Sequence, residues 1–269
     1  MVANELFEQK WSEALKGKKG EEFSIFVPKG KKPQTQRQFN LYYYYRLIER
    51  LIKGRNYKNS IEFGCGRGTI SLYLNLYGGL DVTLFDVDQG GVDLARANFD
   101  LHRAKGSFFV ADSAKVPIAD DSFDIVVTMG LLEHLTNYID SLKEMYRVLK
   151  PGGIMISMNV PKKTSIQILN KIYRKILGAV NKKIELKLDY FRIEETPAGF
   201  QRTAEFVGFK NCSIIHADPL PLFTPVAKPI ERTLAVLYRN FMEFRKLFKS
   251  EPMETGRRLS RCHFLIGYK

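Results

Sequence analysis

Residues 61–69 read Ile61-Glu62-Phe63-Gly64-Cys65-Gly66-Arg67-Gly68-Thr69, a short apolar run that enters a loop of three glycines. Glycine lets the backbone come close to a ligand, and the start of the following helix offers unpaired N–H groups to a carboxylate or phosphate. Dinucleotide dehydrogenases carry G-x-G-x-x-G, whereas here the sixth position is Thr69 and the third glycine comes one residue early. The stretch therefore predicts a ligand-binding turn at a strand end and disfavours a nicotinamide enzyme.

Strand and helix periodicities alternate on both sides of this turn, which is typical of a doubly wound α/β sheet. The apolar run Ile125-Val126-Val127 indicates a strand that is buried on both faces. The expected strands cover residues 60–63, 80–85, 107–110, 122–128, 154–158, 210–216 and 262–268. The expected helices cover residues 68–77, 90–101, 139–149 and 196–207.

Three segments do not fit this alternation. We expect a helical N-terminal cap over residues 1–57, followed by a domain of residues 58–269 with helical inserts at about 162–195 and 219–258. Within the cap, the tyrosines of residues 42–45 would advance about 100° each on a helix, so at least one should be wet or line a cleft. The first insert has an apolar stripe opposed by lysines and arginines, which fits either a lid over the site or a helix on an anionic membrane.

Composition excludes several classes of protein. The chain has 269 residues, 45% of them apolar, so it can bury a full core without disulfides or a structural metal. Its three cysteines form no CxxC pair, and no stretch approaches the roughly 18 apolar residues of a membrane span. We therefore expect a cytoplasmic protein, with a peripheral location at a membrane as the alternative. The net charge of +13 divides into +7 for residues 1–60, −5 for 61–160 and +11 for 161–269. Basic flanks around an acidic middle suggest an anionic partner for the flanks.

The motif at residues 62–68 resembles the first motif of class I S-adenosylmethionine-dependent methyltransferases, an acidic residue, one apolar residue and G-x-G-x-G. Further segments are similar to the later landmarks of the branch of that family that methylates small molecules. They are, in order, Leu84-Phe85-Asp86-Val87-Asp88 with Ala95-Arg96, Ala111-Asp112-Ser113, Asp121-Ser122-Phe123-Asp124, the segment 129–135, and the segment 147–153. The resemblance covers about residues 58–160 and the last two strands. It implies a seven-stranded Rossmann-like methyltransferase sheet with an antiparallel last strand, and S-adenosylmethionine as the cofactor.

The resemblance also implies which residues bind that cofactor. Asp86 would hold the ribose hydroxyls, and it lies 22 residues after Gly64, the spacing that a strand-end carboxylate needs. Glu62 would support the amino group of the methionine moiety, and Asp112 and Ser113 would lie near the adenine. The full set of expected cofactor-binding residues is Glu62, Gly64, Gly66, Gly68, Asp86, Val87, Asp112, Ser113 and Met129. For two neighbouring residues we expect structural roles instead. Asp88 should cap the next helix, and Cys65 should be a small residue in the loop.

Departures from related patterns exclude some reactions. The fourth strand is followed by Thr128-Met129-Gly130-Leu131, not by the D/N-P-P-Y/F/W of amino-nitrogen methylation, and no cysteine follows a proline as in cytosine C5 methylation. Catechol-type enzymes have a metal-binding carboxylate directly after the fourth strand, but here these positions are Thr128 and Met129. The resemblance therefore implies no metal. If a general base exists, the candidate is His134, one helical turn beyond the fourth strand.

We therefore expect an enzyme that moves a methyl group to oxygen, nitrogen or carbon of a small-molecule or lipid-linked acceptor, with the inserts as its lid. Methyl transfer from a sulfonium is an in-line displacement that alignment and exclusion of water can accelerate. RNA or protein methylation through the basic flanks is an alternative, and a non-catalytic cofactor-binding module is another. The insert at 162–187 could lie on an anionic membrane next to a lipid acceptor.

Overall fold

The computed structural model of the chain describes residues 2–16, 23–161, 165–180 and 191–269. Its centre is a seven-stranded sheet in the order β3-β2-β1-β4-β5-β7-β6, and β7 runs antiparallel to both β5 and β6. The strands are β1 (Asn59–Phe63), β2 (Asp81–Asp86), β3 (Ser107–Val110), β4 (Phe123–Met129), β5 (Leu149–Asn159), β6 (Lys210–Ala217) and β7 (Cys262–Tyr268). The predicted sheet with an antiparallel last strand is confirmed.

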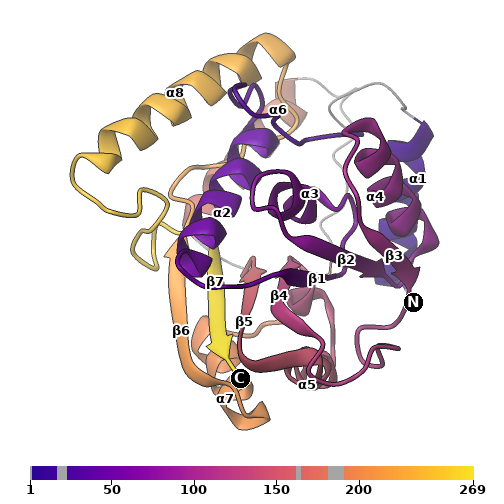
Figure 1. The fold of residues 1–269 in the computed structure, drawn as a ribbon. Coiled ribbons are helices and arrows are strands. Elements are labelled where there is room, and N and C mark those ends of the chain that lie inside the picture. The colour runs from indigo at the N-terminus through magenta and orange to yellow at the C-terminus, as the bar shows by residue number, and fades with distance from the viewer. Residues whose placement is uncertain (1, 17–22, 162–164, 181–190) are drawn as a thin grey trace.

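Helices cover both faces of this sheet (Figure 1). One core cluster joins the sheet to α2, α3, α4 and α8, and a second joins the opposite face to α5 and α7. The helices are α1 (Val2–Lys16), α2 (Gln36–Ile52), α3 (Thr69–Leu76), α4 (Gln89–Leu101), α5 (Tyr138–Val148), α6 (Ser165–Val180), α7 (Pro197–Val207) and α8 (Lys228–Lys246), with a short 3₁₀ helix η1 (Leu132–His134).

Local chemistry explains where the central helices begin and end. Asp88 caps α4 by accepting a hydrogen bond from the backbone N–H of Gly90 at 2.8 Å, which confirms its expected role. Thr196 caps α7 in the same way, with Pro197 in the first turn, and α7 ends at Gly208, whose φ of 120° suits glycine.

The fifth strand begins earlier than the sequence predicts. The Pro151-Gly152-Gly153 turn signal led us to expect a strand only from Ile154, but β5 begins at Leu149, directly after α5. Leu149 pairs with Phe123 of β4, and a register shift between Phe123 and Ile125 accommodates the turn residues. Local turn chemistry was outweighed here by strand pairing across the sheet.

Helix α2 meets neighbours on three sides, which explains its four consecutive tyrosines. Tyr43, Tyr44 and Tyr45 are buried, and Tyr42 is half-buried. Tyr45 stacks on Tyr73 of α3 with ring centroids 5.1 Å apart, whereas the Tyr44 hydroxyl donates to Asp218 at 2.6 Å. The expectation that one tyrosine would stay accessible therefore holds only in part, because the sheet, α3 and α8 surround this helix.

The first predicted insert is described only in part. Helix α6 covers Ser165–Val180, whereas residues 162–164 and 181–190 of the predicted segment lie outside the described residues. Within the part of the chain that the structure describes, no helix is both long and apolar enough to cross a bilayer.

Candidate active site

The carboxyl ends of three neighbouring strands bring the predicted motifs to one edge of the sheet. β1 is parallel to both β2 and β4, and Phe63 is in register with Phe85 of β2 and with Thr128 of β4. The residues that follow these strands are therefore neighbours in space. In open α/β sheets this edge is where ligands bind.

The glycine loop after β1 has a backbone that requires glycine. Gly64, Gly66 and Gly68 all have positive φ, between 48° and 65°. A Cβ on Gly66 would lie 2.8 Å from the ring of Trp11, and a Cβ on Gly68 would lie 2.8 Å from Leu84. The glycines thus serve close approach as well as turning, as the motif predicts.

Asp86 closes the loop from the end of β2. Its carboxylate accepts hydrogen bonds from the backbone N–H groups of Gly66 at 2.9 Å and Asp88 at 3.2 Å. Burial raises the pKa of Asp86 above its ordinary value, although the hydrogen bond from Gly66 opposes that shift. Two N–H donors occupy two of the carboxylate's roughly four lone-pair positions, so the group can still accept hydrogen bonds from a ligand.

Glu62 is buried at the end of β1 beneath the same loop. Its carboxylate accepts hydrogen bonds from the Ser71 hydroxyl at 2.5 Å and from the Ser71 N–H at 3.2 Å. Burial raises the pKa of Glu62 to about 7, and the hydrogen bonds from Ser71 work against this rise. The acid therefore holds the first turn of α3 while one side of it lines the ligand cavity.

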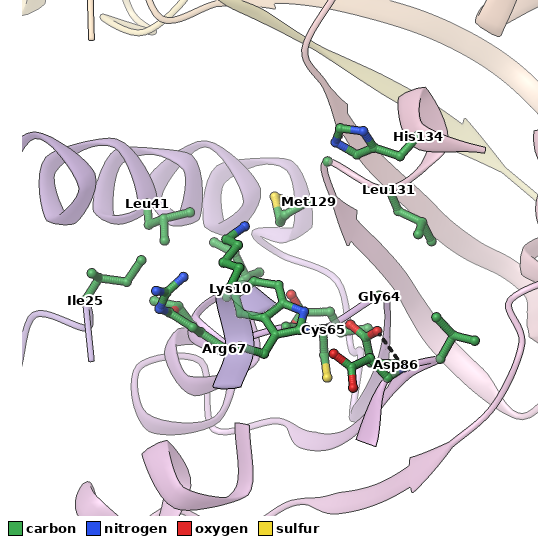
Figure 2. Close-up of a pocket in the computed structure, with 18 of the residues that line it drawn as sticks. Lys10, Ile25, Leu41, Gly64, Cys65, Arg67, Asp86, Met129, Leu131 and His134 are labelled. Atoms are coloured by element: carbon green, nitrogen blue, oxygen red, sulfur yellow. Dashed lines mark hydrogen bonds between the residues drawn. The ribbon is translucent and has the colours of Figure 1, made fainter. Parts of the chain in front are cut away.

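A cavity of about 310 Å³ lies above this edge (Figure 2). Its walls come from α1, α2, the loops after β1, β2 and β4, and η1. In the view of Figure 2, Ile25 and Leu41 lie to the left and Asp86 and Leu131 to the right. The lining residues are Lys10, Trp11, Ile25, Leu41, Glu62, Gly64, Cys65, Gly66, Arg67, Thr69, Ile70, Asp86, Val87, Asp88, Met129, Gly130, Leu131, His134 and Leu135.

Helix α1 covers the glycine loop, which the sequence did not predict. Trp11 lies against Gly66 and near Gly90, and it shares a small apolar cluster with Leu94 of α4. Lys10 and Arg67 both line the cavity beside this ring, with Lys10 Nζ 4.1 Å and the Arg67 guanidinium carbon 5.3 Å from its centroid. The available signal was that Trp11 is the sole tryptophan of the chain. Leu6, Phe7, Trp11, Ala14 and Leu15 follow one another at helical spacing, a pattern that is typical of an ordinary core position.

The described parts of the predicted lid do not reach the cavity, and the prediction that the inserts form a lid stays a prediction. Among the described residues, α6 and α8 contribute none to the cavity lining, whereas α1 contributes Lys10 and Trp11. Within the part of the chain that the structure describes, the helix that covers the glycine loop thus comes from the N-terminal segment.

His134 lines the cavity from η1, as predicted. Its Nδ1 donates to the backbone carbonyl of Phe191 at 2.5 Å, because a carbonyl can only accept, so in the neutral ring Nε2 carries the lone pair. Burial, together with the positive charges of Arg192 and Lys10, lowers the pKa of His134 to about 4. The imidazole is therefore neutral at physiological pH.

Three predicted residues, Gly68, Asp112 and Ser113, lie outside the cavity lining. Asp112 is exposed, and its carboxylate accepts a hydrogen bond from the N–H of Ala114 at 2.9 Å. Ser113 is buried, with its hydroxyl 2.7 Å from that of Ser141 on α5. The other predicted residues, Glu62, Gly64, Gly66, Asp86, Val87 and Met129, line the cavity, and Gly68 supports it from beneath. The roles of Asp112 and Ser113 stay predictions.

These residues fit S-adenosylmethionine. The carboxylate of Asp86 lines the cavity and can accept hydrogen bonds from the hydroxyls of a ribose, and Gly64 and Gly66 bring the loop backbone to the same cavity. The described residues include no group of three or more His, Cys, Asp or Glu side chains that could hold a metal ion. The donor set thus suits an organic cofactor with a sugar.

Comparison with known proteins agrees with this geometry. Residues 61–157 match a family model described as a methyltransferase domain. The chain is 29% identical over 164 residues to the ubiquinone/menaquinone biosynthesis C-methyltransferase UbiE of Geotalea daltonii, covering 56% of this chain and 70% of that protein. It is 25% identical over 207 residues to an uncharacterized protein of Haemophilus influenzae, covering 72% and 78% of the two chains. Several further curated relatives match over less than half of their own length.

Solved structures share the fold at low identity. The (4+2)-cyclase SpnF covers 100% of this chain and 94% of its own, with a TM-score of 0.60 and 15% identity. Phosphoethanolamine N-methyltransferase 2 of Haemonchus contortus, in complex with S-adenosyl-L-methionine, covers 91% of this chain and 55% of its own, with a TM-score of 0.55 and 16% identity. The family model over residues 61–157, the methyltransferase relatives and the shared fold together support a class I S-adenosylmethionine-dependent methyltransferase with S-adenosylmethionine as its cofactor.

Proposed function

We propose that the enzyme transfers a methyl group to an oxygen, nitrogen or carbon atom of a small-molecule or lipid-linked acceptor. The observation that carries this proposal is the composition of the cavity. Polar cofactor-side residues such as Asp86 and Glu62 share it with an apolar wall that includes Ile25, Leu41 and Met129. A wall of that kind suits the hydrocarbon part of an acceptor better than a polar backbone.

Bound S-adenosylmethionine supplies a methyl group on a sulfonium, a carbon that is already activated. The chain then has to align the acceptor and exclude water. Asp86 would bind the ribose hydroxyls, and the backbone of Gly64 and Gly66 would contact the rest of the cofactor. Trp11 packs on Gly66 and so would shield that side of the cavity from solvent.

His134 is the proposed general base. Its neutral ring at physiological pH can accept a proton, and the hydrogen bond from Nδ1 to Phe191 fixes the ring orientation. The lowered pKa makes it a weak base, which suits an acceptor whose proton is lost late in the displacement. We also propose that Asp112 and Ser113 lie near the adenine of the bound cofactor.

Names of relatives support an acceptor of this class. UbiE is a C-methyltransferase of ubiquinone/menaquinone biosynthesis, and another relative is a methyltransferase of phthiotriol/phenolphthiotriol dimycocerosates. We also propose association with an anionic membrane surface, which is tested separately from the class of acceptor. RNA or protein methylation is the second candidate, favoured by the net charge of +11 over residues 161–269.

The test is to incubate the enzyme with methyl-labelled S-adenosylmethionine and a cell extract, and to separate metabolites, lipids, RNA and protein before mass spectrometry. We expect label in the metabolite or lipid fraction, and less label with the Asp86→Ala variant, whose cofactor binding should be weakened. Label confined to RNA or protein would contradict the proposal. A matched salt series adds a second readout, because binding through many phosphates weakens steeply with salt and a neutral small acceptor does not respond in that way.

A further inference from the structure

Helix α8 exposes a continuous apolar stripe. Ile230, Leu237, Phe241, Phe244 and Phe248 follow one another at steps of seven, four, three and four, and their exposed fractions are 55%, 56%, 41%, 57% and 74%. The buried side of the same helix is a different line, formed by Ala235, Tyr238 and Met242. Packing within the chain therefore does not cover this exposed apolar line of α8. An exposed apolar line of this length marks a contact surface.

Helix α6 exposes a second apolar line close to the start of α8. Ile168, Leu169, Ile172 and Ile176 are exposed to between 44% and 60%. The other side of α6 is tied to the segment that leads into α8, because the Tyr173 hydroxyl donates to the carbonyl of Pro225 at 2.6 Å and Asn170 accepts from the N–H of Thr224 at 3.1 Å. We call the nine exposed residues of these two helices the α6–α8 surface. Figure 1 shows α8 at the outer edge of the molecule, beside α2.

Both helices are basic. Helix α6 carries Lys171, Arg174 and Lys175 and no acidic residue, and α8 carries five basic residues against two acidic ones. Lys171 and Lys175 are exposed beside the apolar line of α6. Apolar residues on one side and lysines or arginines on the other are the pattern of a helix that lies in the interface of an anionic bilayer. A second copy of the chain fits less well, because it would bring like charges together.

The α6–α8 surface lies at the same edge of the sheet as the cavity. Helix α6 follows the carboxyl end of β5, which is parallel to β4. β6 pairs antiparallel with β7, and β7 with β5, so β6 also ends at this edge before the chain runs on to α8. A membrane that met this surface would therefore lie next to the edge at which methyl transfer takes place.

We propose that the α6–α8 surface docks the enzyme onto an anionic lipid surface. Docking brings lipid-linked acceptors to the cavity edge. The choice of a lipid acceptor rests on the proposed function, whereas the docking itself does not.

The experiment is co-sedimentation of the full chain with phosphatidylcholine vesicles that contain or lack phosphatidylserine, at low and at moderate salt. Binding is expected only with phosphatidylserine and more strongly at low salt. The double variant Phe241→Ser with Phe244→Ser should lose about tenfold or more in vesicle affinity, because two phenyl rings no longer leave water. Lys171→Gln with Lys175→Gln should lose roughly 25-fold, since each lysine near an anionic surface contributes about 1 kcal/mol.

Matched controls come from the opposite face and the far edge. Phe206 of α7 is 81% exposed, so Phe206→Ser removes an equally accessible phenyl ring away from the surface, and Lys105→Gln with Lys115→Gln removes two distant charges. Both controls should bind vesicles as the unmodified protein does. All variants should keep their affinity for S-adenosylmethionine, which checks that they are folded.

Absence of vesicle binding by the unmodified protein at low salt would overturn the docking proposal, as would equal losses in the controls. A dimer in solution that the Phe241 and Phe244 changes dissociate would also overturn it and would assign the surface to a second copy. Vesicle binding without label in any lipid leaves docking intact and contradicts only the lipid part of the proposed function.

Discussion

Replacement of Asp86 by alanine should weaken the binding of S-adenosylmethionine by about 2 to 4 kcal/mol. The carboxylate accepts from the N–H groups of Gly66 and Asp88, which leaves about two lone-pair positions for the two ribose hydroxyls. Each hydrogen bond to a charged acceptor contributes roughly 1 to 2 kcal/mol at such a site. The dissociation constant should therefore rise about 30- to 700-fold.

Two variants separate binding from folding. Asp86→Asn keeps an oxygen that can accept from Gly66, so it should hold the loop while losing the charge, and its affinity should lie between those of the unmodified protein and the alanine variant. Asp88→Asn changes a carboxylate two residues away whose function is to cap α4, and asparagine caps helices as well as aspartate does. That control should bind the cofactor nearly as the unmodified protein does.

Isothermal titration calorimetry is the assay, with thermal unfolding measured on the same samples. Burial raises the pKa of Asp86, so affinity should fall as the pH drops through that raised value and the carboxylate becomes protonated. The alanine variant should lack this fall. A folded Asp86→Ala protein whose dissociation constant stays within about threefold of the original would refute the reasoning.

Three further changes test other parts of the structure. His134→Ala should slow the single-turnover chemical step by roughly a hundredfold if the imidazole accepts a proton, and a loss below about tenfold would leave it only a positioning role. For Glu133, burial raises the pKa to about 7, so its contribution to the free energy of unfolding is present below about pH 4.5 and is lost as the pH rises through 7. Between about pH 4.5 and 7 the free energy of unfolding, measured by chemical denaturation, should therefore fall by up to about 3 kcal/mol less in Glu133→Gln than in the unmodified protein. Parallel curves of unfolding free energy against pH would refute this. Asp218→Ala should lower the free energy of unfolding by about 3 to 5 kcal/mol, because it leaves Arg261 and the Tyr44 hydroxyl buried without their shared acceptor, and a change below about 1 kcal/mol would contradict that role.

Elements with strong local signals were predictable from the sequence. The glycine loop, the strand-end Asp86 and the cap at Asp88 depend on residues within a few positions of one another, and the structure places all three as predicted. The seven-stranded sheet with an antiparallel last strand followed from a motif resemblance that spans most of the sheet. The early start of β5 was missed because pairing of Leu149 with Phe123 is a contact across the sheet.

Long-range packing was harder to predict. Apolar residues that recur at steps of three and four indicate a helix with an apolar side. This pattern does not predict which part of the protein covers that side. For Trp11 the stripe belongs to a helix that covers the glycine loop more than 50 residues away, whereas for Phe241 and Phe244 much of the stripe stays exposed. The sequence could not distinguish these outcomes, because both satisfy the same periodicity.

The most direct test of the account uses Trp11, the sole tryptophan of the chain, which lies in the cavity on Gly66. Its fluorescence should change saturably when S-adenosylmethionine or S-adenosylhomocysteine is added and should not respond to a nicotinamide dinucleotide. The Asp86→Ala variant should need a higher ligand concentration for the same change. A tryptophan signal that ignores S-adenosylmethionine while calorimetry detects its binding elsewhere on the folded chain would contradict the central claim that this cavity is the cofactor site.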